Sequence, residues 1–198
     1  MLQTLTKHAL KEWAVTIKAL DEGKQILLLR KGGIREKEFK IEHEEFMLYP
    51  SFEHQKRELI KPEFMPDIQA TWAPWGGEAP KEPLTSVTFT HFAKVKHIIE
   101  ITDPAKVEAL SPYYIWTVQY AEKRHYWRPR KPLEVLLVHT FRLERPYVVP
   151  VSPYYAGCKS WVDLDEGLPL GSLTPVISEE EFEVRAQEIR KVLERTWS

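Results

Sequence analysis

The stretch from residue 123 to residue 131 has the charge pattern most typical of a nucleic-acid contact. It contains five cationic side chains and no acidic one, with Tyr126 and Trp127 among them. Cations offset backbone phosphates, and aromatic rings stack on bases. We therefore take as candidate nucleic-acid contacts Trp127, Arg128, Arg130 and Lys131. The alternative is a solvated helix end that leads into a strand.

A second group of chemically useful side chains lies in residues 49–56. Tyr49, Glu53, His54 and Gln55 supply an aromatic ring, a carboxylate, an imidazole and an amide. A carboxylate and an amide can read the Watson–Crick edge of a base, and an aromatic ring can stack on its face. With Trp116, these residues are the predicted lining of a base pocket, although a helix cap beside core aromatics would look the same. Glu53 and His54 are also the candidates for acid–base catalysis.

Two shorter motifs place cations beside glycines. Glycine lets the backbone approach a ligand closely, and cations and backbone amides suit phosphate. The first motif, residues 30–35, follows an apolar run and could equally be a solvated hairpin turn. The second motif, residues 157–161, follows a pair of tyrosines. Both join the candidate ligand contacts, which adds Arg30, Lys31, Gly32, Gly33, Lys159, Ser160 and Trp161.

No strong catalytic or cofactor motif accompanies these groups. The sequence lacks a phosphate-binding loop, a dinucleotide fingerprint, Gly-x-Ser-x-Gly and His-Glu-x-x-His. Its seven histidines are scattered, and its single cysteine, Cys158, excludes an intramolecular disulfide and any multi-cysteine metal centre. We expect no metal and no cofactor, and the residues leave open whether the chain is an enzyme.

The elements that must position these groups are mixed. Apolar spacing predicts a helix over residues 10–20, ended near Gly23, and strands over residues 25–30, 39–41, 45–49, 85–101 and 133–143, with a break near Ala93. Further helices are predicted over residues 51–59, from Asp103-Pro104, over residues 112–124, and after a capping box at Ser178 and Glu181. The Pro-rich residues 61–84 and 146–176 are predicted to be irregular. Because strands and helices do not alternate regularly, the pattern favours an α+β fold with a curled, mainly antiparallel sheet.

Composition limits the class of protein. The chain has 198 residues, 43% of them hydrophobic, and a formal net charge of -1, which predicts a single globular domain over residues 1–198. No apolar stretch reaches the length of a signal peptide or a membrane span, so we expect a cytoplasmic protein without membrane contact. The balanced charge argues against a polycation that coats a duplex and leaves room for a local basic site.

Several segments resemble an uncharacterised prokaryotic family, number 1802 among the domains of unknown function. The resemblance is carried by residues 9–13, 27–34, 49–55, 110–117 and 157–161, and so spans nearly the whole chain. Such domains occur alongside restriction-endonuclease-type domains. The resemblance therefore implies a role in DNA metabolism or defence and a partner protein of restriction type.

The opening of the chain is also similar to that of ASCH domains in the PUA-like superfamily, small curled β-barrels that bind RNA or read modified bases. Their opening pattern is Gly-x-Lys-x-x-Glu-x-Arg. Gly23 and Arg30 match it, whereas Gln25 and Leu28 replace the Lys and the Glu. The resemblance implies a PUA-like β-barrel with flanking helices. Because related hydrolases of modified nucleosides depend on that Lys, its absence speaks against the same hydrolysis here.

Together these features predict a nucleic-acid-binding module, for DNA or RNA, that could read a single modified base. Two alternatives stay open. One is a hydrolase acting on a nucleoside or nucleotide, or a nuclease. The other is a non-catalytic interaction subunit, marked by an apolar patch around Trp72 and Trp75.

Overall fold

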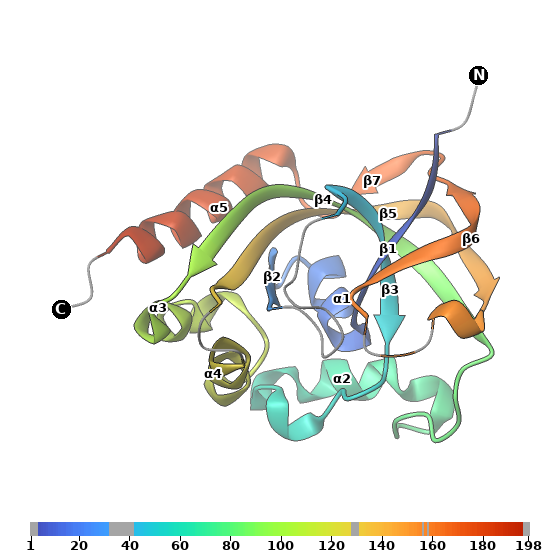
Figure 1. Ribbon diagram of the computed structural model, residues 1–198, viewed down its shortest axis with the longest axis horizontal. Helices are drawn as coiled ribbons and strands as arrows, with labels where there is room; N and C mark the ends of the chain where they lie inside the picture. Colours follow the sequence, from blue (N-terminus) through green and yellow to red (C-terminus); the bar gives the residue numbers. More distant parts are fainter. Residues whose placement is uncertain (1–3, 32–41, 128–130, 156, 158, 196–198) are drawn as a thin grey trace.

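The protein folds around one strongly curved sheet. The computed structural model describes residues 4–31, 42–127, 131–155, 157 and 159–195 (Figure 1). The strands are β1 (Leu5–Trp13), β2 (Leu27–Arg30), β3 (Glu45–Ser51), β4 (Ser86–Ile101), β5 (Leu133–Pro150), β6 (Trp161–Pro169) and β7 (Leu173–Pro175). The helices are α1 (Ala14–Asp21), α2 (Met65–Thr71), α3 (Pro104–Ala109), α4 (Val118–Tyr126) and α5 (Glu179–Glu194).

The strand order is β2-β5-β4-β3-β1-β6, with β7 paired to β5. Among the described strands β1 and β3 form the one parallel pair, and the other pairs are antiparallel. The predicted α+β fold with a curled, mainly antiparallel sheet is therefore confirmed. In the described part of the chain no ladder joins β2 to β6, so the sheet is open rather than a closed barrel.

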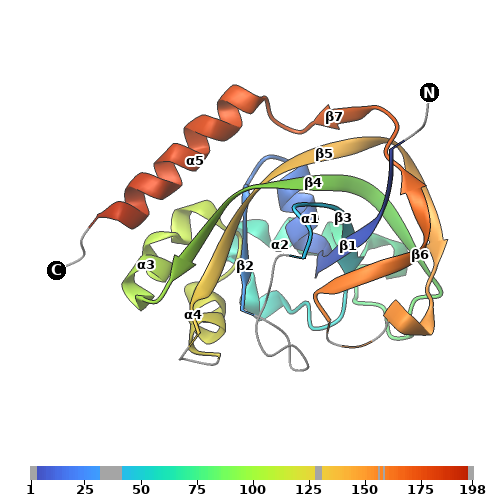
Figure 2. The ribbon, with the colours of Figure 1, turned by 45° about the horizontal axis from the view of Figure 1, so that its top comes forward.

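The curvature comes from the two longest strands. β4 and β5 pair along nearly their whole lengths and arch over α1 (Figures 1 and 2). The register shifts between Phe89 and His91 and again between Val95 and His97. β-Bulges bend and twist a strand. Instead of the predicted break near Ala93, the strand is continuous there and bends at the two irregularities on either side.

Four predicted elements differ from the structure. Residues 61–84, predicted to be irregular, contain α2 and two 3₁₀ turns. The first half of the predicted helix over residues 10–20 is the end of β1, and α1 begins only at Ala14. Residues 51–59 form no long helix, only a 3₁₀ turn at Arg57–Leu59. Residues 146–176 are largely strand, because β5 runs to Pro150 and β6 and β7 follow. The predicted strand at residues 39–41 lies outside the described residues.

The other helices follow the sequence more closely. Ser178 Oγ accepts a hydrogen bond from Glu181 N at 3.1 Å, which confirms the predicted cap of α5. Asp103 caps α3 in the same way. The helix predicted over residues 112–124 is a 3₁₀ turn at Ser111–Tyr113 followed by α4. None of the helices in the described ranges combines the length and apolar character that crossing a membrane requires.

Alternation along β3 divides the interior. Phe46 and Leu48 pack with α1 inside the arch, whereas Met47 and Tyr49 face a second apolar cluster with Phe89 and Tyr155. Side chains of successive strand residues point to opposite faces of a sheet. The same rule separates Lys11 from its buried neighbour Glu12 on β1. These two strands therefore decide which groups reach the candidate site.

Asp21, at the end of α1, ties that helix to the arch. Arg142 Nε donates to Asp21 Oδ1 at 2.5 Å, and His91 Nε2 lies 2.9 Å from the same oxygen. Partial burial acts to raise the pKa of Asp21, but the hydrogen bonds and charges of His91 and Arg142 outweigh it and hold the pKa below its ordinary value.

We expect Asp21→Asn to reduce the acid sensitivity of the fold. Because the pKa of Asp21 is lowered on folding, its stabilising contribution is present above pH of about 4 and is lost as the pH falls through the folded pKa. Urea unfolding at pH 7, 5 and 3 should therefore show the difference between wild type and Asp21→Asn shrinking toward low pH. The exposed variant Glu58→Gln is the control, and a difference that stayed constant with pH would contradict the assignment.

Candidate functional site

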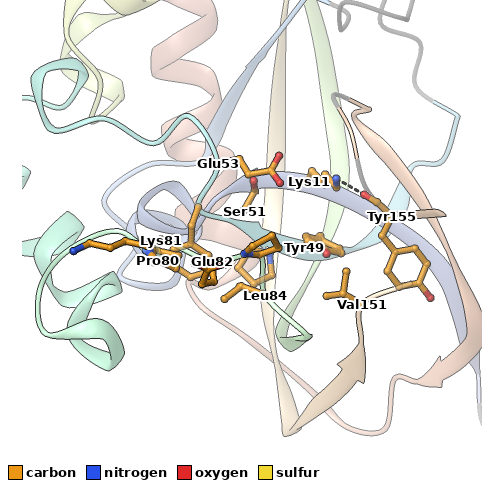
Figure 3. Close-up of a pocket in the computed structure, with 13 residues that line it drawn as sticks. Lys11, Tyr49, Ser51, Glu53, Pro80, Lys81, Glu82, Leu84, Val151 and Tyr155 are labelled. Atoms are coloured by element: carbon orange, nitrogen blue, oxygen red, sulfur yellow. Dashed lines mark hydrogen bonds between the residues drawn. The ribbon is translucent and has the colours of Figure 1, made fainter. Parts of the chain in front are cut away.

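A cavity of about 330 Å³ opens where β1 and β3 end (Figure 3). Four segments line it: Lys11 of β1, residues 49–53 at the end of β3, residues 80–84 of the Pro-rich connection, and Val151 with Tyr155. Cavities of a few hundred Å³ with apolar walls and a few polar groups are typical of small-ligand sites. The lining here has that composition, with Lys11, Ser51 and Glu53 among prolines and aromatic rings.

Tyr49 forms the aromatic wall of the cavity. Its ring packs edge-on against Phe89, with 5.6 Å between centroids, and against Tyr155 at 6.4 Å. Burial, and then the nearby Glu53 and Tyr155, raise the pKa of Tyr49 above its ordinary value. The phenol therefore stays protonated at neutral pH and can donate a hydrogen bond.

Lys11 places a cation beside this ring. Lys11 and Tyr49 are register partners across the parallel pair, and Lys11 Nζ lies 5.4 Å from the Tyr49 ring centroid. The ammonium also donates to the carbonyl oxygens of Tyr155 and, at 3.1 Å, Gly157. Figure 3 shows the bond to Tyr155 as a dashed line. Lys11 thus holds the far wall in place and brings positive charge to the cavity.

A second cavity of about 530 Å³ adjoins the first through Pro50, Phe52 and Leu84, which line both. Phe52 packs edge-on against Trp75, with 4.9 Å between ring centroids. Trp75 is 37% exposed, so its ring is partly open to solvent. The two cavities therefore share part of their walls.

Of the predicted ligand contacts, Tyr49 and Glu53 come together in the first cavity. Sequence reasoning missed Lys11, because residues 10–13 looked helical. It also missed residues 80–84, although it singled out the connection to which they belong. A strand assignment for residues 9–13 would have placed Lys11 and Glu12 on opposite faces.

Arg30 and Lys31 lie buried at the end of β2. Arg30 Nη2 donates to Glu12 Oε2 at 2.8 Å and to the Lys11 carbonyl at 2.5 Å. Lys31 Nζ donates to the carbonyl of His125, and burial lowers the pKa of Lys31. These bonds join β2 to β1 and to α4. Gly32 and Gly33 lie outside the described residues.

Gln55 and Trp116 also have partners inside the fold. Gln55 Oε1 accepts from Val15 N at 3.0 Å, which satisfies the first turn of α1. Trp116 is 1% exposed and packs between Tyr114 and Tyr120 in the largest apolar cluster. His54 is exposed, with φ of 62° in the left-handed region.

The basic stretch ends α4. Arg124 Nε donates to Tyr120 Oη at 2.7 Å, and His125 is buried, whereas Tyr126, Trp127 and Lys131 are exposed. Arg128 and Arg130 lie outside the described residues. The lining of the first cavity includes no residue of this stretch.

The second glycine-containing motif, residues 157–161, leads into β6. Lys159 Nζ donates to the carbonyl of Tyr154 at 2.5 Å. Ser160 is buried and its carbonyl accepts from Lys11 N at 2.8 Å, so it supports the strand that carries Lys11. Trp161 packs edge-on against Phe46, with 5.1 Å between centroids.

Comparisons with known proteins give one family and one distant structure. No curated protein matches the sequence. A crystal structure of a single-substitution mutant of ZmASCH from Zymomonas mobilis is similar over 94% of this chain and 99% of its own, with 13% identity and a TM-score of 0.40. The family model described as "Domain of unknown function (DUF1802)" matches residues 9–188, and the chain belongs to that family.

Proposed function

We propose that this protein is a nucleic-acid-binding module that holds a single base in the cavity beside Tyr49. The observation that carries the proposal is the convergence of a Tyr ring, an ammonium 5.4 Å from its centroid and the Glu53 carboxylate in one cavity of about 330 Å³. An aromatic ring can stack on a base of any sequence. A carboxylate accepts hydrogen bonds from the amino and imino groups of a base edge.

The surrounding charges favour a local pocket over a long electrostatic track. The side chains of Arg30, Lys31 and Arg124 are engaged in bonds within the fold. These three cations are therefore held within the fold, and we propose that affinity depends on one or two nucleotides. Each neutralised phosphate of a single strand contributes about 0.7 to the slope of log affinity against log salt. For one or two phosphates we expect a slope of about -0.7 to -1.4.

We expect Glu53→Gln to weaken binding of the preferred base by about 1–3 kcal/mol, because it removes the negative charge and replaces one acceptor oxygen by an NH2 donor. Fluorescence anisotropy with short labelled single-stranded DNA and RNA, plain and base-modified, measures the dissociation constants. Glu58→Gln is the matched control, since Glu58 is also exposed and lies outside the cavity lining. Equal affinity of the two variants for every probe, or no binding at low salt, would contradict the proposal.

A further inference from the structure

Three side chains far apart in the sequence meet on the other face of β1. His8 lies on β1, Asp163 is its cross-strand partner on β6, and His43 precedes β3 on the opposite side of β1. Their ligand atoms all lie within 4.8 Å of one another. His8 is three residues from Lys11, so alternation directs the two side chains to opposite faces. This cluster is therefore separate from the cavity beside Tyr49.

The two imidazoles and the carboxylate lie close together. His8 Nδ1 lies 2.9 Å from Asp163 Oδ1. The rings of His8 and His43 are stacked, with 3.3 Å between centroids and 12° between planes. Trp161 packs edge-on against His43 at 5.5 Å, which restricts the orientation of that ring.

We propose that His8, His43 and Asp163 form a binding site for one first-row divalent cation, with Zn²⁺ as the probe. Imidazole nitrogen and carboxylate oxygen bind zinc at about 2.0–2.2 Å, which puts the ligand atoms of one ion roughly 3–4 Å apart. The ligand atoms lie within 4.8 Å of one another here, and binding one ion would require the two stacked rings to turn toward it. Two histidines and one carboxylate are a donor set that suits zinc and its neighbours and leaves a coordination position for water or a ligand.

The position of the three residues explains why the sequence predicted no metal. Metal motifs are recognised when ligands recur at short spacings. Here the ligands come from residues 8, 43 and 163, and only the order β3-β1-β6 brings them together. The side chains of His8 and Asp163 are 39% and 78% exposed, so an ion can reach the site without unfolding of the chain.

Isothermal titration of the metal-free full chain with Zn²⁺ tests the proposal. We expect one equivalent to bind, and His43→Ala and Asp163→Ala each to weaken the affinity at least about ten-fold, because loss even of outer-shell partners has effects of this size. His54→Asn is the matched control. It removes an exposed histidine away from the cluster, and Asn tolerates the left-handed backbone there. This control should bind Zn²⁺ as the wild type does.

Circular dichroism without metal separates loss of ligation from loss of folding. Asp163→Ala is the decisive variant, since the Asp163 side chain is 78% exposed and its removal leaves the core intact. Unchanged zinc affinity in a folded Asp163→Ala, or an equal loss in His54→Asn, would show dispersed surface binding and overturn the proposal. Loss of affinity in folded Asp163→Ala with retention in His54→Asn supports it.

Discussion

Replacing Glu12 by glutamine is expected to lower the free energy of unfolding by about 3–5 kcal/mol. Glu12 and Arg30 form an ion pair of 2.8 Å whose side chains are 3% and 7% exposed. The charge of Glu12 also acts on Arg124, at the far side of the same cluster. The variant therefore leaves buried guanidinium charge without its carboxylate, which is far more costly than replacing both partners. Urea denaturation at pH 7, followed by tryptophan fluorescence, measures the effect.

Two controls test whether the loss of stability comes from the buried Glu12–Arg30 ion pair: a double variant and a surface ion pair. Glu12→Gln combined with Arg30→Met should cost clearly less than the sum of the two single changes, because the residues share one interaction. Lys94 and Glu45 form an ion pair of 2.6 Å at the surface, with side chains 36% and 54% exposed. Glu45→Gln should cost less than about 1 kcal/mol. An effect of Glu12→Gln no larger than that of Glu45→Gln would refute the argument.

Trp116→Ala is the second change with a large expected effect, a loss of about 3–5 kcal/mol of stability. The side chain is 1% exposed, and its ring centroid lies 5.8 Å from that of Tyr114 and 5.4 Å from that of Tyr120. Truncation would leave a large void in the main core. The same unfolding measurement, made with far-UV circular dichroism because a tryptophan is removed, gives the value.

Trp116→Phe separates this core role from the sequence-based assignment to a base pocket. Phe keeps much of the ring, so the variant should be more stable than Trp116→Ala and should bind single-stranded probes as the wild type does. Trp116 Nε1 has no hydrogen-bond partner within the described ranges, so the change removes no bond there. If Trp116→Phe folds normally and yet weakens binding as much as Glu53→Gln, Trp116 belongs to the ligand site.

Local signals in the sequence were sufficient where an element depends on its own residues. The Ser178 cap and the apolar stripe of Phe182, Ile189 and Leu193 define α5 without reference to the rest of the chain. Residues 10–13 show the opposite case. Leu10, Glu12 and Trp13 are all buried, because Leu10 packs in one apolar cluster and Trp13 in another on the opposite face of the strand. Burial on both faces removes the alternation that marks a strand in the sequence.

The same distinction between local sequence and tertiary pairing applies to the residues of the candidate site. Tyr49 and Glu53 could be proposed from the sequence because their chemistry lies within one short segment. Lys11 joins them only through the pairing of β1 with β3. That pairing cannot be predicted from residue 11 and its neighbours in the sequence. Conversely, Gln55 has the right chemistry for base reading, but its amide is engaged by the start of α1 and by Thr71. The sequence alone does not show which polar side chains form hydrogen bonds within the fold.

The parallel pairing of β1 with β3 has a consequence for how this family could diversify. The cavity lies at the carboxyl ends of β1 and β3, the edge at which ligands gather in parallel sheets. Much of its wall is supplied by residues 51–53 and 80–84, which follow or connect strands rather than form the ladders between them. Connecting segments accept substitution more readily than the elements they join. Under the proposed function, relatives could therefore exchange one ligand for another by changing these few positions, while β1, β3 and the Lys11 anchor stayed the same.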